Sequence, residues 1–438
     1  MKKTYPSGPR RASRILPQTC DLEGVTPLGG LNHLNRFLRE QGLDRELAAL
    51  FGQAKAPWAK WSFDRVVRLL LDLSFAGVAR LWHAEDLQRD PLLCAQHQVD
   101  RLLDFTSLYR ELRRFGNADL RQGLQKQLAT VVVRELARER RTVLEIDSTV
   151  ETLYGRQKGA ALGVNPSHPG RVSLHPLLAR DRITDLVVHH VLRPGNAGTA
   201  TDIVPFLHRT IDLVQESGPK EEILARLDSG FESEAVLRLL EWRRVGYVIK
   251  VRGTAELAHF AAMLPASVWR RLEFDGAGEL AIASIFWRRG SWSCERRVVV
   301  LRKREMDELQ GHLFDADGWS YSLFVTDRDW AAEDVARFYD KRADVERVIC
   351  ELKNDLSIDH VPTADFHANA ADLALKILAR NLLVLYREHG LHLTTRERIV
   401  TLRRRYLQVA GRVVCHAGRL RLRLSVHSPL SRALGASP

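Results

Sequence analysis

The spacing of apolar and polar residues divides the chain into a helical part and a part rich in strands. Between about residues 28 and 140, apolar residues recur at steps of three and four, as in WSFDRVVRLLLDLSF and NADLRQGLQKQLATVVVREL, which predicts helices. From about residue 142 the pattern changes, and TVLEIDST, RVSLHPLLARD and ITDLVVHHVLRPG are three expected strands. Helix, strand, helix and strand then follow up to YVIKVRG. This order predicts a mixed α/β domain.

The second half of the chain contains an interruption and then a long helix. Residues 253–328 hold four strand-like stretches, RRLEF, LAIASIFW, SCERRVVVLRKR and YSLFVTD, so we expect a β-rich insertion there. A long helix is expected over AAEDVARFYDKRADVERVICELKNDL with Asp329 as its N-cap, and an apolar helix over ADLALKILARNLLVLYREHG. The stretch GRVVCHAGRLRLRLSV predicts a hairpin with Arg419, Arg421 and Arg423 on one face.

The expected fold class is therefore α/β, with a mixed-sheet core, a β-rich insertion and an all-helical N-terminal domain. The expected divisions are a basic flexible arm (1–20), a helical DNA-binding domain (21–140), the first part of the core (141–252), the β-rich insertion (253–328), the second part of the core with a glutamate-bearing helix (329–390) and a basic C-terminal segment (391–438).

The helical domain contains a short basic helix. Thr106 or Ser107 can cap a helix that carries three arginines, Arg110, Arg113 and Arg114. With the helix expected to start near Pro91, this pattern is consistent with a helix-turn-helix whose second helix meets DNA. An ordinary small helical domain would show the same pattern, and that alternative stays open.

The charge balance favours a polyanionic partner. The chain of 438 residues has a formal net charge of +12, and nucleic acid is the commonest polyanion that such a charge attracts. No acid precedes Asp21, and residues 391–432 contain ten arginines and one acid, Glu397. This clustering favours an electrostatic footprint over scattered solubilising charge. We therefore expect DNA contacts from the run Arg403, Arg404 and Arg405, although a solvated basic surface is the alternative.

The cysteines and the hydropathy pattern bear on the compartment. The five cysteines are far apart and form no CxxC or zinc-like spacing, so free thiols in a reducing compartment are expected. The N-terminus lacks the apolar core of a signal peptide, and no stretch approaches about 18 uncharged apolar residues. We expect a soluble, cytoplasmic protein with no membrane partner.

One stretch, FYDKRADVERVICELKND at 338–355, carries four chemically distinct side chains, Tyr339, Arg342, Glu346 and Lys353. At about 100° per residue these positions fall within roughly 60° of one another on a helix. Glu346 lies about 20° from Tyr339 and the competing Glu351 about 120° away, so the stripe selects Glu346. The alternative for Glu346 is an exposed salt bridge with Arg342 four residues earlier.

Two aspartates upstream end strand-like stretches, Asp147 in TVLEIDST and Asp228 in ILARLDSGF. Three carboxylates from separate elements suggest a site for divalent metal that works on phosphate. Such a set can hold two Mg²⁺ ions about 4 Å apart, and Mn²⁺ is expected to substitute. Taken singly, Asp147 could be an ordinary strand-end acid, and Asp228 could be a turn residue in DSG.

The pattern Y-x2-R-x3-E-x6-K after two separated aspartates resembles the signature of DDE transposases of the insertion-sequence-4 superfamily. RAD-x-E-x3-CELK, DSGF and RPGN at 193–196 resemble more narrowly its insertion-sequence-1380 branch. The resemblance covers roughly residues 140–425 and implies a ribonuclease-H-like core. It implies metal binding by Asp147, Asp228 and Glu346. It implies contacts with DNA phosphates near the scissile bond from Tyr339, Arg342 and Lys353.

The resemblance also implies an activity. Such enzymes cut DNA at terminal inverted repeats and join the freed 3′ ends to a target with Mg²⁺. The implied partners are double-stranded DNA, both transposon ends and target, and a second copy of the chain on paired ends. The implied setting is the bacterial cytoplasm, with the protein on the nucleoid when bound to DNA. Two alternatives remain: an inactive or repurposed transposase that only binds DNA, and a metal-dependent nuclease of the same fold.

Tryptophans among arginines in the insertion offer one more DNA contact. An aromatic side chain beside cations can hold a base flipped out of the stack. Trp292, near Gly290 in an expected turn, is the tryptophan that we most expect to be exposed. Packing within a small β unit is the alternative, and it is favoured for any one tryptophan.

Overall fold

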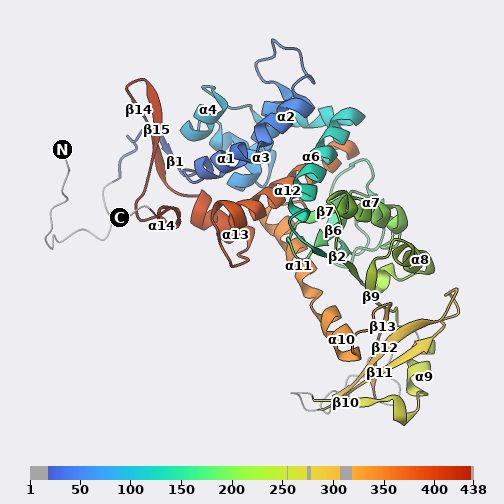
Figure 1. The fold of residues 1–438 in the computed structure, drawn as a ribbon. Coiled ribbons are helices and arrows are strands. Elements are labelled where there is room, and N and C mark those ends of the chain that lie inside the picture. The colour runs from blue at the N-terminus through green and yellow to red at the C-terminus, as the bar shows by residue number, and fades with distance from the viewer. Residues whose placement is uncertain (1–17, 254, 274–277, 306–317, 436–438) are drawn as a thin grey trace.

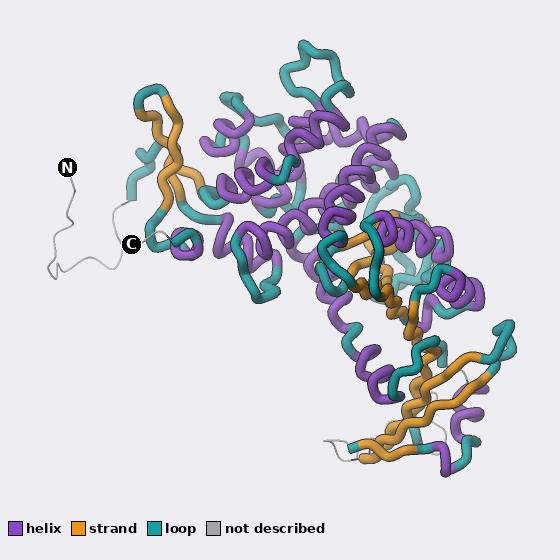
Figure 2. Tube along the Cα trace, in the orientation of Figure 1, coloured by secondary structure: helices purple, strands orange, loops and turns teal. Residues whose placement is uncertain are grey.

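The computed structural model describes residues 18–253, 255–273, 278–305 and 318–435 (Figure 1). A mainly helical body, a mixed sheet next to it and a projecting lobe of long strands follow one another across the molecule (Figure 2). Within the described ranges, no helix has the length and apolar content needed to cross a bilayer.

The N-terminal part is helical, as its periodicity predicts. Its α-helices are α1 (Leu31–Glu40), α2 (Leu43–Phe51), α3 (Phe63–Ala76), α4 (Pro91–His97), α5 (Phe105–Leu112) and α6 (Ala118–Leu136), with 3-10 turns at Leu81–Leu87 and Arg113–Gly116. Asp90 caps α4 by accepting from the backbone amides of Leu92 and Leu93, and Pro91 occupies the first helical position.

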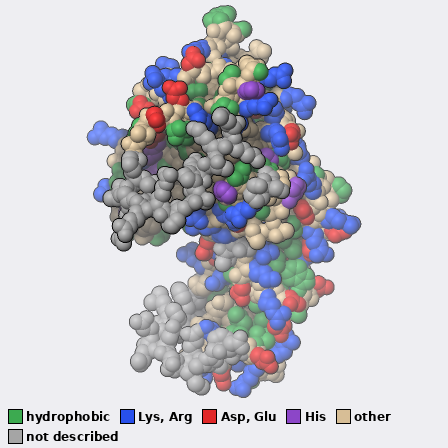
Figure 3. Space-filling view, turned by 90° about the vertical axis from the view of Figure 1, so that its left-hand side faces the viewer, with side chains coloured by type: hydrophobic (Ala, Val, Ile, Leu, Met, Phe, Trp, Pro, Cys, Tyr) green, Lys and Arg blue, Asp and Glu red, His purple; other side chains and the backbone are tan. Residues whose placement is uncertain are grey.

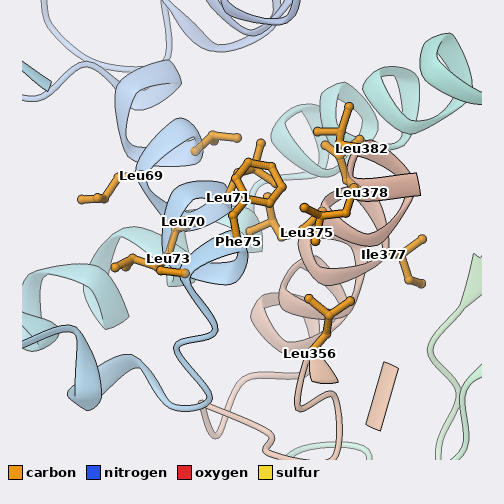
Figure 4. Close-up of a cluster of buried hydrophobic side chains, with 14 of the residues drawn as sticks. Leu69, Leu70, Leu71, Leu73, Phe75, Leu356, Leu375, Ile377, Leu378 and Leu382 are labelled. Atoms are coloured by element: carbon orange, nitrogen blue, oxygen red, sulfur yellow. The ribbon is translucent and has the colours of Figure 1, made fainter. Parts of the chain in front are cut away.

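These helices share one core with the C-terminal half of the chain. Helix α12 (Phe366–Leu385) is buried on nearly all sides, and its Leu375, Leu378 and Leu382 lie opposite Leu71 and Phe75 of α3 (Figure 4). The same core includes buried residues of α13 (Ile399–Leu402) and the π-helical segment Arg403–Leu407. The N-terminal helices therefore depend on residues far along the chain to cover their apolar faces.

The central sheet has the strand order β7-β6-β2-β8-β9. Its strands are β2 (Arg141–Ser148), β6 (Leu177–Asp181), β7 (Val187–Val191), β8 (Glu222–Leu227) and β9 (Gly246–Lys250). Strand β2 is parallel to β8, β8 is parallel to β9, and β6 runs antiparallel to both of its neighbours. Helices α7 (Ile203–Glu216) and α8 (Glu234–Trp242) pack with the sheet in a second apolar core.

The expected strand RVSLHPLLARD is divided by a proline. Residues Val172–Leu174 form β5 in a small sheet with β3 (Glu151–Thr152) and β4 (Ala161–Leu162), whereas β6 begins at Leu177. Pro176 lies between the two strands and has no N–H to donate to a ladder, which explains the division.

The segment expected as a β-rich insertion extends the central sheet. Strands β13 (Ser320–Thr326), β12 (Arg296–Glu305), β11 (Gly278–Trp287) and β10 (Arg270–Leu272) add antiparallel to β9, giving nine strands. They form the lower lobe, which is set off from the upper body by a hollow (Figure 3). The segment also contains helix α9 (Ala255–Ala262), which the strand pattern did not predict.

The expected single long helix is broken. Helix α10 (Ala332–Asp340) ends before two turn residues, α11 (Ala343–Cys350) follows, and a π-helical segment covers Glu351–Asp355. The predicted N-cap Asp329 is also wrong, because the helix begins after Ala331. After α12 come a π-helical segment at Tyr386–Gly390, then β14 (Gly411–His416), β15 (Arg419–Leu424) and α14 (Pro429–Ala433).

Candidate active site

The two strand-end aspartates lie side by side at one edge of the sheet. Glu145 of β2 is in register with Arg226 of β8, and the two strands are parallel. Two residues further on, Asp147 and Asp228 therefore lie level at the carboxyl ends of neighbouring strands. This is the edge at which α/β sheets place ligands.

The break between α10 and α11 directs two signature residues at these aspartates. Arg342 Nη2 lies 3.4 Å from Asp147 Oδ2 and 3.9 Å from Asp228 Oδ2. The Tyr339 hydroxyl donates a hydrogen bond of 3.1 Å to Asp228 Oδ1. One guanidinium nitrogen of Arg342 thus contacts both carboxylates. A metal cation between the two aspartates could be bound by both carboxylates in the same way.

Burial and charge both act on the titration of these groups. Burial raises the pKa of Asp147; Arg342 opposes this, and the negative charges of Asp228 and Glu346 add to it. Burial also raises the pKa of Tyr339 well above its usual value, and the neighbouring Asp228 raises it further. Tyr339 is therefore a neutral hydrogen-bond donor at physiological pH.

Glu346 and Lys353 stand in different surroundings. Glu346 is exposed on α11, and its negative charge adds to the rise in the pKa of Asp147. Lys353 lies in the π-helical segment, and its Nζ donates a hydrogen bond of 3.1 Å to the carbonyl oxygen of Val150, just after β2. Lys353 therefore ties the loop after Asp147 to the helix that carries Glu346.

The competing Glu351 has another partner. It is fully buried, and its Oε2 accepts hydrogen bonds from Arg380 Nε at 3.1 Å and Nη2 at 2.9 Å. Arg347 Nη1 lies 3.4 Å from its other oxygen. These contacts fix Glu351 inside the protein, away from the strand ends.

The donor set fits a hard divalent cation. Asp147, Asp228 and Glu346 offer carboxylate oxygens, the ligands that Mg²⁺ prefers. Their ligand atoms are not all within 4.8 Å of one another, the closeness that a single ion would need. A site for two ions about 4 Å apart spreads its ligands more widely, so this spacing is compatible with such a site.

A tighter group of ligand atoms lies elsewhere, at Glu135, Glu388 and His389. Two arginines already contact this group: Arg138 Nη1 lies 3.0 Å from His389 Nε2, and Arg387 Nη2 lies 2.9 Å from Glu388 Oε1. A cation there would face both guanidiniums, so we interpret the group as a network of ion pairs.

Arg226 is a residue that the sequence pattern did not single out. Its buried guanidinium pairs with Glu145, donates to the carbonyl oxygen of Phe338 and donates at 2.7 Å to that of Lys341. Phe338 lies in the last turn of α10, and Lys341 lies in the turn between α10 and α11. Because these carbonyls turn toward Arg226, Arg226 explains why the helix breaks there and links the break to the strands bearing Asp147 and Asp228. The signal in the sequence was an arginine within the apolar run ILARL.

The expected exposure of Trp292 is wrong. Trp292 is only 2% exposed, and its Nε1 donates to Glu232 Oε1 at 2.9 Å. Its ring packs edge-on against Trp287 with the centroids 5.5 Å apart. An indole held in this way cannot stack on a base without repacking of the core, so packing, the favoured alternative, explains it.

The helix with Arg110 begins with a different cap from the two expected. Asp104 is the N-cap and accepts from the Ser107 amide at 2.8 Å, so the prediction of Thr106 or Ser107 is wrong. The connection from α4 to α5 covers residues 98–104, longer than the ~3–4-residue turn of a helix-turn-helix. Ordinary helical packing is therefore the better interpretation. The three predicted arginines, Arg110, Arg113 and Arg114, are exposed.

The arginine run in the C-terminal part has three different environments. Arg403 is buried and donates to the carbonyl oxygens of Phe75 at 2.9 Å and Asp355 at 3.0 Å, so its expected DNA contact is wrong. Burial lowers its pKa to about 10. Arg405 pairs with Glu397, and Arg404 is exposed. A helical period turns successive residues in different directions, so a run of like residues cannot share one face.

Comparison with models of protein families identifies the family of this chain. The model of the family described as "Transposase DDE domain group 1" matches residues 19–437. A search among curated proteins finds no similar sequence. Among solved structures, a piggyBac transposase synaptic complex with hairpin DNA aligns with a TM-score of 0.46 and 11% identity, over 86% of this chain and 78% of that one. The family match extends over nearly the whole sequence, and the chain therefore belongs to the DDE transposase domain group 1 family.

Proposed function

We propose that this protein is a DNA transposase that cleaves the ends of a mobile element and joins the 3′ ends to target DNA. The observation that carries the proposal is the convergence of Arg342 and Tyr339 on Asp147 and Asp228 at the sheet edge. Asp228 and Tyr339 are 111 positions apart in the sequence and are in contact here. Carboxylates that can hold a metal ion are the side chains that phosphodiester chemistry needs. The proposed substrate is double-stranded DNA with terminal inverted repeats.

The proposed core is ribonuclease-H-like. The order β7-β6-β2-β8-β9, with β6 alone antiparallel among these five strands, supports this assignment. The four-residue signature and the RPGN and DSGF stretches support placement in the insertion-sequence-4 superfamily and its insertion-sequence-1380 branch. A second copy of the chain on paired ends is part of the proposal.

Asp147, Asp228 and Glu346 are the proposed holders of Mg²⁺, with Mn²⁺ as a substitute. When bound, divalent ions lower the pKa of an attacking water or 3′-hydroxyl and stabilise the leaving oxygen. The chain's own residues supply the rest. Arg342 can leave the two carboxylates to fork the oxygens of a phosphate. Tyr339, neutral because of its raised pKa, donates one hydrogen bond.

Two other functions remain possible outcomes of a test. A nuclease of the same fold would hydrolyse DNA without joining it. A repurposed protein would bind DNA without cutting it. The three carboxylates at the strand edge and on α11 favour the catalytic proposals over the inert one, because a protein that only binds DNA gains nothing from acids beside phosphates.

The test is a cleavage and strand-transfer assay on the DNA that flanks this gene, with Mg²⁺. Wild type is compared with Asp147→Ala and Glu346→Gln, and with Glu40→Gln as a control at an exposed glutamate of α1. We expect cuts at inverted-repeat boundaries and joined products, lost in both site variants and kept in the control. Cleavage without joining would support the nuclease. Full cleavage by Glu346→Gln would contradict the assigned site.

A further inference from the structure

The β14–β15 hairpin concentrates arginines on one of its faces. Arg412 is in register with Arg423, Val414 with Arg421, and His416 with Arg419. Residues directly opposite one another in an antiparallel pair project to the same side. Four arginines, Arg412, Arg419, Arg421 and Arg423, therefore share a face, and all four are exposed. Only the last three were expected to do so from the alternation in the sequence.

These charges lack acidic partners. None of the four arginines forms an ion pair with a described residue, and Arg412 Nε donates to a neutral group, the carbonyl oxygen of Glu23, at 3.1 Å. Residues 1–20 and 398–438 contain no aspartate or glutamate. Like charges directly opposite each other destabilise a strand pair. The arrangement therefore costs stability unless an anion lies against this face.

The hairpin is anchored at its base and free at its tip. Strand β1 (Val25–Thr26) pairs with β14, and Val413 donates its amide to the Gly24 carbonyl at 2.8 Å. Leu422 and Leu424, on the other face, pack against the helical core. The tip is the two-residue turn Ala417–Gly418, where both φ angles are positive, and neighbouring Leu420 is 62% exposed. Figure 1 shows the hairpin projecting beyond the helices, at the end of the molecule opposite β10–β13.

The shape of this arm suits a DNA groove. A two-stranded ribbon fits the major groove, which is about 12 Å wide. Alternate residues of a strand lie about 7 Å apart, so the arginines of β15 present a row of evenly spaced cations to a phosphate backbone. The free edge of β15 could instead pair with a second copy, but a row of arginines opposes such pairing.

We propose that the hairpin Gly411–Leu424 is a DNA-binding ribbon that docks on duplex DNA through this arginine face, separately from the catalytic edge. This proposal rests on the proposed function only in one respect, the choice of an element-end duplex as the DNA that is tested. It assigns to the hairpin a contact with DNA that involves no cleavage.

The test uses the full chain with R419Q/R421Q/R423Q and measures binding to an element-end duplex by fluorescence anisotropy at several salt concentrations. Three lost phosphate contacts should reduce the slope of log affinity against log salt by about 2.7, at about 0.9 per phosphate. Between 50 and 200 mM salt, wild-type affinity should thus fall roughly 40-fold more than that of the variant. The matched control R45Q/R209Q/R238Q removes the same charge at exposed sites elsewhere and should keep the wild-type slope.

Several outcomes separate this proposal from the rest. Equal salt slopes for the hairpin variant and the control would overturn the proposal. A changed oligomeric state of the hairpin variant in light scattering, together with an unchanged salt slope, would also overturn it, because the hairpin would then be an interface between copies of the chain. If wild type cleaves DNA and the hairpin variant keeps the slope, only the hairpin proposal fails. If wild type binds no duplex, both fail. Because the three side chains are exposed, an unchanged melting temperature verifies the fold.

Discussion

Replacing Arg226 should lower both the stability of the protein and its cleavage rate, for two separate reasons. Arg226 is fully buried, pairs with Glu145 and holds the carbonyl oxygens of Phe338 and Lys341 at the turn between α10 and α11. Arg226→Gln removes the charge that faces a buried carboxylate and leaves at least one carbonyl without a donor. Breaking a buried pair costs about 3–5 kcal/mol. This is a large part of the free energy of unfolding of a typical domain, which is about 5–15 kcal/mol.

The catalytic effect has a separate origin. With the two carbonyls released, the turn that directs Tyr339 and Arg342 at Asp147 and Asp228 loses its link to the strands. A misplacement of about 1 Å can cost about 100-fold in rate. We expect Arg226→Gln to cleave DNA about 100-fold more slowly at a temperature where circular dichroism shows it fully folded.

A second variant distinguishes positioning from stability. In E145Q/R226Q the buried charges are removed together, and Glu145's other partner, Arg180, keeps Asp185 at 3.7 Å. This double variant should regain at least half of the lost unfolding free energy in urea, yet remain slow in cleavage. Arg403→Gln serves as the control, because it removes a buried arginine that holds carbonyls in the helical body. If cleavage recovers together with stability in E145Q/R226Q, Arg226 acts only through the fold and the reasoning is refuted.

Three further predictions concern Trp292, Glu151 and Arg342. Trp292→Phe should lower the unfolding free energy by about 1–3 kcal/mol, because Oε1 of the buried Glu232 carboxylate loses its indole donor and keeps only the pairing of Arg289 with the other oxygen. DNA affinity should not change, and weaker binding by a folded variant would restore the base-stacking role. Burial raises the pKa of Glu151 to about 8. The folded chain therefore keeps a proton on Glu151 that the unfolded chain releases near pH 4.5. The protonated carboxyl contributes fully to the free energy of unfolding below about pH 4.5, and this contribution is lost as the pH rises toward 8. Glu151→Gln should remove that decline, at most about 1.4 kcal/mol per pH unit, in urea titrations; parallel curves for both proteins would contradict it. Arg342→Gln should bind Mn²⁺ more tightly than wild type in calorimetry without DNA, because the guanidinium no longer competes for the carboxylates of Asp147 and Asp228. The same variant should cleave DNA more slowly. Weaker Mn²⁺ binding would show that Arg342 does not compete.

Local patterns predicted that Asp147 and Asp228 lie at strand ends. Asp147 and Asp228 end strands in the sequence because apolar runs precede them, and the parallel register of β2 and β8 then makes them neighbours. The angular argument on residues 338–355 assumed an unbroken helix, and that assumption is wrong. Tyr339 and Arg342 nevertheless both contact Asp228.

The failures share a cause. Trp292 sits near a glycine turn, which locally suggests exposure, but Glu232 and Trp287 come from other elements and enclose it. Arg403 belongs to a run of arginines, but α3 and Asp355 offer carbonyl oxygens that satisfy it inside the core. Partners far away in the chain are invisible to a local pattern.

The sequence by itself determined the helical and strand-like stretches, the signature residues, the basic ends and the resemblance to DDE transposases, because each follows from neighbouring residues. Only the tertiary structure decided which charges are buried, where the long helix breaks and which arginines stay free. Burying a charge is costly unless a partner meets it, and such partners come from distant segments. Arg226 and Arg421 illustrate the difference: both alternate with apolar residues in a strand, yet Arg226 is buried and holds the turn between α10 and α11, whereas Arg421 faces solvent.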